Sequence, residues 1–430
     1  MKRKSVRPKY LVHAWIIWLL SAFFMFYKYA LEVSPSVMTN TLMSEYHIDG
    51  AQLGSLAASY FYAYLIMQIP AGLLLDRYGP RKVTSLAIIA CTLGVFLFAR
   101  SESLFVASVG RFVIGIGAAF AAVNCLKLIA NWFPSRQFAF MSGLMMSVGM
   151  LGAVGGQAPL SAFIHEFYWR DALEIIALVG LIFSSVFFLV VRNTSPDRVR
   201  EKHIVSPKIS LFKSLSTILK SPQAWYLSIY SGFAFAPVMV FGGLWGVSFI
   251  EEAYGFSKTI SSQAVSLIFV GFAVGAPIFG WFSDWLKNRK KVMFWGTLAS
   301  CVFLLLIIYF PNLSYHFLTL FLFLFGFAIS SFLLCFTVIR EINVPGVAAT
   351  AIGFMNSFDA LFGSFSDPLT GMFLDVFWDG KLVNGARIFS VAAYGKAFII
   401  LPIYLIISLG FLFFIKETYC KPREEPSFLP

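Results

Sequence analysis

The side chains best suited to chemistry are four charged residues that interrupt long apolar segments: Lys28, Glu32, Arg111 and Asp359. An unpaired charge in apolar surroundings is costly, so each is expected to face a partner, a ligand or water. Lys28 and Glu32 are four residues apart, which on a helix allows an ion pair. Lys28 and Arg111 could bind the carboxylate of a small zwitterion, and Asp359 could bind its ammonium group. Glu32 would then hold Arg111 or carry a proton.

Each charged position also has a structural interpretation. Lys28 could be an interfacial residue or simply the partner of Glu32, and a Glu32–Arg111 pair could do no more than join two helices. Lys127 is near enough to the end of its apolar segment for its ammonium group to reach the interface. Asp367 precedes Pro368, and the structural role of capping a helix break is favoured for it.

Three uncharged side chains are candidates to line the same cavity. Tyr60 and Tyr64 are one helical turn apart, and packing explains them equally well. Asn356 lies three residues before Asp359. We therefore expect substrate contacts from Tyr60, Tyr64 and Asn356 in addition to the charged residues.

Composition determines which elements must position these residues. Of the 430 residues, 59% are hydrophobic and 13% are charged, whereas soluble domains have about 45–50% and about 25%. A soluble enzyme is therefore excluded, and no catalytic residue is assigned. Apolar segments of about 20 residues recur along the chain, as expected for membrane-spanning helices. The sequence predicts an all-α membrane protein with helices at about 13–37, 51–75, 83–100, 104–131, 138–163, 170–191, 223–250, 260–285, 292–311, 315–339, 347–374 and 393–415.

The distribution of basic residues predicts the orientation of this helical bundle. With both termini in the cytoplasm, 24 of the 33 Lys and Arg residues lie in cytoplasmic segments, six lie in outer loops and three lie within the membrane. This asymmetry follows the positive-inside rule. The net charge of +12 is thus explained by topology, and nucleic acid is not expected as a partner.

Several other chemistries leave no trace in the sequence. The five cysteines and five histidines have no spacing typical of a metal site, and an odd number of cysteines within apolar segments argues against a disulfide framework. The chain contains no phosphate-binding loop of the G-x-x-x-x-G-K-[ST] type. We expect no cofactor and no metal, with a small molecule, a coupling proton and the lipid bilayer as the partners of a monomer.

The chain repeats itself with an offset of about 210 residues. Cys91 and Cys301 are 210 residues apart, as are Cys125 and Cys335. The sequence therefore predicts two six-helix halves, 1–191 and 223–430, joined by a cytoplasmic linker at 192–222. A substrate site between such halves is typical of transporters. The buried charges do not recur, since Phe321 stands 210 residues after Arg111, and this favours a role in binding over a role in the scaffold.

Two motifs resemble those of the major facilitator superfamily. The segment Gly72-Leu-Leu-Leu-Asp76-Arg77-Tyr78-Gly79-Pro80-Arg81-Lys82 is similar to the signature of its loop between helices 2 and 3, and Arg111-Phe-Val-Ile-Gly115 is similar to its second motif. The resemblance implies twelve helices, transport by alternating access, and a gating loop made by Gly72, Asp76, Arg77, Gly79 and Arg81. A degenerate copy of this motif keeps Asp284 and Arg289 but has Trp285 in place of a basic residue, which puts the gating role of the second copy in doubt.

A narrower resemblance concerns the substrate. Ser34-Pro35-Ser36, Tyr60-Phe-Tyr-Ala-Tyr64 and Leu244-Trp245-Gly246 are similar to stretches of the proteobacterial phagosomal amino-acid transporter family and of lysosomal dipeptide transporter-like proteins. This resemblance implies import of amino acids or short peptides across a bacterial inner membrane, and adds Trp245 to the candidate substrate contacts. A proton-coupled exporter of drugs or another metabolite is the main alternative, and a non-transporting receptor or scaffold is a remote one.

Overall fold

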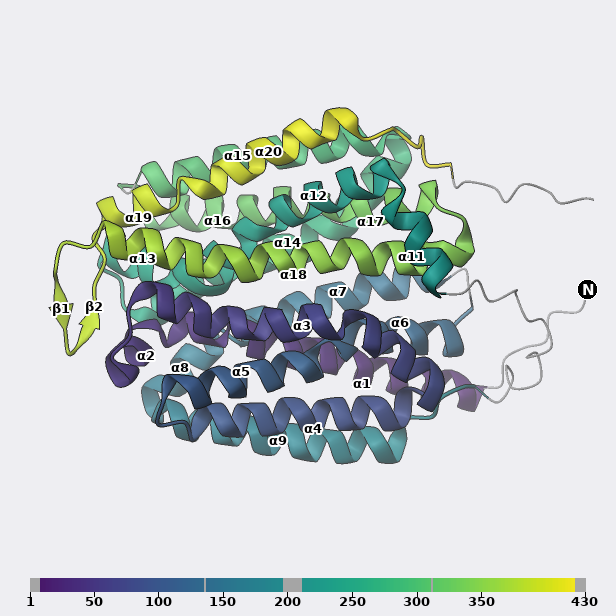
Figure 1. Ribbon diagram of the computed structural model, residues 1–430, viewed down its shortest axis with the longest axis horizontal. Helices are drawn as coiled ribbons and strands as arrows, with labels where there is room; N and C mark the ends of the chain where they lie inside the picture. Colours follow the sequence, from purple (N-terminus) through teal and green to yellow (C-terminus); the bar gives the residue numbers. More distant parts are fainter. Residues whose placement is uncertain (1–7, 135–136, 196–210, 311, 422–430) are drawn as a thin grey trace, which may run out of the picture.

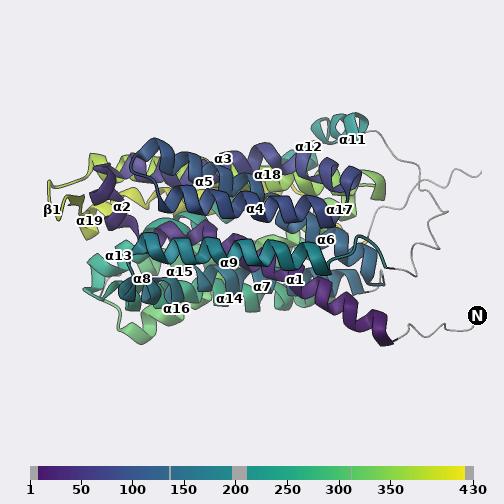
Figure 2. The same ribbon diagram turned by 90° about the horizontal axis from the view of Figure 1, so that it is seen from below.

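The computed structural model describes residues 8–134, 137–195, 211–310 and 312–421. They form an elongated bundle of nearly parallel and antiparallel helices (Figures 1 and 2). The helices that precede residue 191 lie together in the lower part of Figure 1. Their bounds are α1 Pro8–Val33, α2 Thr39–Tyr46, α3 Gly50–Tyr78, α4 Pro80–Ala99, α5 Leu104–Ala118, α6 Phe120–Trp132, α7 Phe138–Gly155, α8 Ala158–Glu166 and α9 Trp169–Val190, with a 3₁₀ turn, η1, at Ser34–Val37.

The remaining helices form the upper part of Figure 1. They are α11 Leu211–Leu219, α12 Pro222–Pro237, α13 Gly246–Tyr254, α14 Lys258–Leu286, α15 Arg289–Tyr309, α16 Tyr315–Ile329, α17 Leu334–Ile342, α18 Pro345–Val376, α19 Val391–Ala397 and α20 Ile400–Phe414. A π-helical segment, η3 (Val238–Trp245), and a 3₁₀ turn, η4 (Ser330–Leu333), lie within them. Most of the expected linker, 196–210, lies outside the described residues.

The twelve-helix fold is confirmed. Eleven helical spans in the described part of the chain are long and apolar enough to cross a membrane, and the 32-residue α18 completes the set. Six of the expected helices are interrupted, however: by η1, η3 and η4, and at Ala119, at 156–157 and at 398–399. Helix irregularities of this kind place main-chain groups where side chains or ligands can reach them.

A small hairpin marks one end of the bundle. β1 (Leu382–Val383) pairs with β2 (Ala386–Arg387) in antiparallel register. Asn384 and Gly385 between them both have positive φ, as a two-residue type I′ turn requires. We call this the hairpin end. The opposite end, where α1 begins and α20 finishes, is called the terminal end (Figure 1).

The helices of the two parts approach each other more closely at glycines near the hairpin end than at glycines toward the terminal end. Near the hairpin end, a Cβ atom on Gly54 of α3 would lie 2.4 Å from the Asp367 carbonyl oxygen of α18. Toward the terminal end, four glycines of α3, α7, α14 and α18 have no neighbouring atom within 4 Å of the place that a Cβ atom would take: Gly72, Gly143, Gly280 and Gly353. At these glycines, the facing helices are in close contact near the hairpin end and leave open space toward the terminal end.

Candidate functional site

The expected ion pair between Lys28 and Glu32 forms on α1. Both side chains are almost fully buried, with residue exposures of 5% and 6%, and the ammonium group contacts the Glu32 carboxylate directly. Their spacing of one helical turn brings them together, as the sequence predicts. Because the two charges neutralise each other, the pair can remain in an apolar bundle until something competes for one of its members.

Three tyrosine rings surround the Lys28 ammonium group. Its Nζ lies 3.5 Å from the ring centroid of Tyr29, 5.1 Å from that of Tyr64 and 5.9 Å from that of Tyr60. Rings at such distances stabilise a cation through their negative faces. Tyr60 and Tyr64, one turn apart on α3, stack at 6.1 Å. Tyr29 was not among the expected site residues, although its position next to Lys28 placed it within reach.

Arg111 meets Glu32 differently from the expected carboxylate pair. Its guanidinium donates hydrogen bonds to the main-chain oxygens of Leu31 at 2.6 Å and Glu32 at 3.1 Å. These carbonyls are available because α1 finishes at Val33 and leaves its last oxygens without helical partners. Arg111, which is fully buried, therefore caps the end of α1, while the Glu32 carboxylate is occupied by Lys28.

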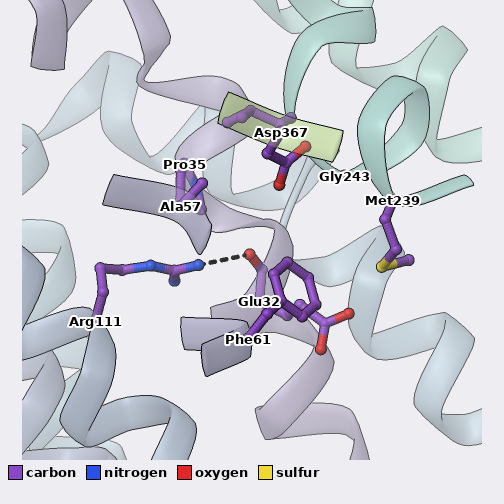
Figure 3. A pocket seen from close by; sticks show the side chains of 9 residues that line it. Glu32, Pro35, Ala57, Phe61, Arg111, Met239, Gly243 and Asp367 are labelled. Atoms are coloured by element: carbon purple, nitrogen blue, oxygen red, sulfur yellow. Dashed lines mark hydrogen bonds between the residues drawn. The ribbon is translucent and has the colours of Figure 1, made fainter. Parts of the chain in front are cut away.

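A small cavity connects this helix end to the other part of the bundle (Figure 3). Its volume is about 10 Å³, which is room for about one water-sized group. Glu32 and Arg111 line it from α1 and α5, and Asp367 lines it from α18. Pro35, Ala57, Phe61, Met239, Gly243 and Leu244 complete the lining.

Asp367 needs a correction to its expected role. The sequence favoured a cap at a helix break before Pro368, but α18 runs unbroken from Pro345 to Val376. The Asp367 side chain instead faces the cavity that Arg111 lines, and its Oδ1 has no hydrogen-bond partner among the described residues. Its presence within an apolar segment was the signal that could have marked it as a site residue.

Asp359 and Asn356 lie one turn apart on α18 and face different partners. Asp359 is buried and accepts a hydrogen bond of 2.6 Å from Ser231 of α12. Asn356 donates to the Tyr64 hydroxyl of α3 at 3.5 Å, a contact between the two parts of the bundle. The buried Trp245 in η3 contacts the Phe389 ring edge-on, at 6.3 Å, near the hairpin end.

The expected gating loop is paired within its own part of the bundle. Asp76 accepts a hydrogen bond of 2.5 Å from Lys127, which also donates to the Leu75 carbonyl at 2.6 Å. Lys127 thus binds the end of α3, which corrects the expectation that it only reaches for the interface. Arg81 donates to the Phe188 carbonyl at 2.6 Å. No direct Asp76–Arg81 contact is formed in the described chain.

The other three residues of this loop lie in the turn after α3 or within α3 itself. Gly79 has a φ of +85°, a backbone conformation that L side chains rarely adopt, and joins α3 to α4. The Arg77 guanidinium lies 5.2 Å from the ring centroid of Tyr78. Gly72, which precedes them in α3, has open space beside it.

The second copy of the motif forms a tighter ion-pair network. Arg289 contacts the Asp284 carboxylate at 2.6 Å and the Glu341 carboxylate of α17 at 3.0 Å. Arg289 is buried, whereas Trp285, which replaces the basic residue, is 68% exposed. These carboxylate partners of Arg289 are on its own side of the bundle, and Glu341 was not anticipated.

One family model matches most of the chain. The sequence profile described as Major Facilitator Superfamily matches residues 16–367. A hexuronate transporter of Bacillus subtilis is 23% identical over 279 residues, covering 62% of this chain and 65% of the relative, which is less than two thirds of its length. The lysosomal dipeptide transporter MFSD1 of Danio rerio is 25% identical over 312 residues, covering 69% of this chain and 67% of the relative.

A solved structure shares the fold along almost the whole chain. It is that of a bacterial homologue of the human lysosomal transporter Spinster, in an inward-facing and unoccupied conformation. The TM-score is 0.78 at 17% identity, and the alignment covers 95% of this chain and 97% of that chain. At this identity the likeness concerns the fold alone.

Proposed function

Because the chain belongs to the Major Facilitator Superfamily and spans the membrane many times, we propose that it is a secondary transporter that works by alternating access. Its moving bodies are the two halves, 1–191 and 223–430, connected by the linker 192–222. The substrate site lies between them, where α1 and α3 face α18. The unequal contacts at the two ends of the bundle support this proposal, because alternating access requires one end to be closed while the other is open.

The terminal end faces the cytoplasm in this proposal. The split of 24 to six basic residues supports cytoplasmic termini and an external hairpin end. The membrane in this proposal is a bacterial inner membrane. Reporter fusions should therefore place Lys208 in the cytoplasm and Asn384 outside, and finding both on one side would contradict the orientation. With this orientation, the described conformation is open to the cytoplasm.

The substrate is a small molecule with an acidic group, and an amino acid or short peptide fits best. The observation that carries this proposal is the buried Lys28–Glu32 pair within its tyrosine cage, beside the Tyr64–Asn356 contact between the halves. A substrate carboxylate can replace Glu32 as the partner of Lys28, with Arg111 as a second cation. Asp359, which accepts a hydrogen bond from Ser231, would bind the ammonium group of the substrate from the C-terminal half.

Exchange of partners at Lys28 also provides a route for coupling to protons. While Glu32 is ionised, it competes with an acidic substrate for the ammonium group. A proton on Glu32 removes that competition and leaves Lys28 free to bind the substrate. The binding of one proton and one substrate is then mutually favourable, which is the requirement for symport.

Direct binding is the test of this function. Purified protein is screened by thermal shift against amino acids, dipeptides, nucleosides and organic acids, and hits are tested for uptake into proteoliposomes. We expect saturable stabilisation and uptake of an amino acid or a short peptide. If no compound with an acidic group binds or is transported, the proposed substrate class is wrong.

A plain organic acid is the second candidate, because a relative is a transporter of hexuronate. Lys28 and Arg111 would serve such a substrate equally well, but Asp359 would have no ammonium group to bind. Asp359→Asn distinguishes the two candidates. It should weaken binding of a zwitterion about 10- to 100-fold, and should change binding of a plain acid little.

A further inference from the structure

The first turn of α3 has two main-chain donors that its own half leaves unpaired. Asp49 and Gln52 form a capping box, which satisfies the Gln52 N–H and the Asp49 N–H. The N–H groups of Gly50 and Ala51 lie between them. Since the first N–H groups of a helix have no helical acceptor, these two need a partner from elsewhere.

Asp375, at the end of α18 in the other half, supplies that partner. Its Oδ1 accepts from Gly50 at 2.9 Å, and its Oδ2 accepts from Ala51 at 2.8 Å. A carboxylate at a helix N-terminus is also favoured by the helix dipole. Arg387 of β2 donates to Asp375 Oδ1 at 2.9 Å and so holds the carboxylate in place from within its own half.

The backbones of α3 and α18 come close enough for these hydrogen bonds because glycines lie where the helices cross. A Cβ atom on Gly371 would lie 2.1 Å from the Gly50 carbonyl oxygen, a distance that real Cβ atoms do not show. Gly54, one turn along α3, is equally confined by Asp367. Small residues at a helix crossing allow such an approach, and any opening of the hairpin end must separate this crossing.

We infer that Asp375, together with the Gly50–Gly371 crossing, is a latch that keeps the hairpin end closed and so sets which way the substrate-free protein faces. The inference rests on the proposed movement of the two halves. When the hairpin end opens, Asp375 exchanges two main-chain donors for water. No carboxylate of one half binds a helix N-terminus of the other at the terminal end of the described structure, so the latch acts at one end only.

The test follows both ends of the substrate-free protein by distances between spin labels. One pair is placed at Glu102 and Asn312, which are exposed at the hairpin end on opposite halves. A second pair is placed at Lys82 and Lys291, which are exposed at the terminal end. Cys420 is replaced by serine, because it is the one partly exposed cysteine of the described chain.

Asp375→Asn should raise the ratio of hairpin-open to hairpin-closed molecules about tenfold or more, with a matching shortening at the terminal end. Asp379→Asn is the matched control, since Asp379 is exposed and, in the described chain, accepts a hydrogen bond from the nearby Lys381 N–H rather than from the opposite half. Gly371→Ala should act in the same direction without changing any charge. Gly353→Ala, in the same helix but with open space beside it, should leave both distance distributions unchanged.

The result that overturns the latch is a distance distribution for Asp375→Asn and Gly371→Ala that matches the wild type. If Asp375→Asn does not fold, Gly371→Ala decides on its own. Neither measurement requires a substrate. Failure of the latch is therefore distinguishable from failure of the proposed transport, which the uptake assay tests in the wild-type protein.

Discussion

The two ends of the bundle are built differently, although α3 and α18 run through both. At the hairpin end, α3 and α18 cross at glycines, and Asp375 binds main-chain N–H groups of the opposite half. At the terminal end, Gly72 and Gly353 of the same two helices have open space beside them. Charged residues are present at both ends, but Asp76 and Arg289 are paired within their own halves. Contact between halves, rather than the number of charges, distinguishes the closed end from the open one.

Two glycines of α3 give the strongest test of this comparison. Gly54→Ala places a Cβ against the Asp367 carbonyl, whereas Gly72→Ala fills open space. We expect Gly54→Ala to cost the hairpin-closed state about 1–3 kcal/mol, because overpacking at a confined site forces the helices apart. Gly72→Ala should be neutral or slightly stabilising, since alanine is the better helix former. Spin-label distances at the hairpin end measure both, and an equal response would break the comparison.

Replacing Asp76 probes the terminal end and should have a smaller effect on the stability of the described state. Its side chain is 77% exposed and pairs with Lys127 of its own half, so Asp76→Asn should change the stability of the described state by less than about 0.5 kcal/mol. If Asp76 closes the terminal end in the opposite state, the variant should still slow transport while substrate affinity stays within a few-fold. Wild-type flux would argue against a gating role for Asp76.

Replacing Glu45 of α2 should have the smallest effect, because Glu45 lies at the hairpin end but has its hydrogen-bond partners in its own half. Burial disfavours its charge, yet hydrogen bonds from Arg170, Tyr168 and Trp169 outweigh burial and hold the pKa of Glu45 below its ordinary value. The resulting stability is present above the ordinary pKa and is lost as the pH falls through the lowered one. Glu45→Gln should therefore lower the melting temperature slightly at neutral pH and not in acid, without opening the hairpin end.

The sequence predicts the helices better than their interruptions. Apolar length and basic asymmetry indicate twelve spans, and all of them are found, because the bilayer imposes both signals. The π-helical segment Val238–Trp245 lies within a continuous apolar run, so hydropathy gives no sign of it. It is held by tertiary contacts such as the hydrogen bond of 2.5 Å from the buried Gln157 to the Gly242 carbonyl.

The site shows the same division between local and distant contacts. The Lys28–Glu32 pair depends only on helical spacing and is predicted correctly. The contacts of Arg111 depend on where α1 finishes, and those of Asp375 depend on which helix start lies opposite. Both require the tertiary arrangement, and the sequence at the end of α18 gave no indication of a latch.

Substrate uptake by Lys28 variants tests the central claim most directly. Lys28→Ala should abolish uptake at low substrate concentration, because it removes the cation that binds the substrate carboxylate. The double variant Lys28→Ala, Glu32→Gln leaves no unpaired buried charge, so it separates a ligand-binding lysine from a structural partner of Glu32. The account predicts that the folded double variant remains inactive, and restored uptake in that variant would contradict it.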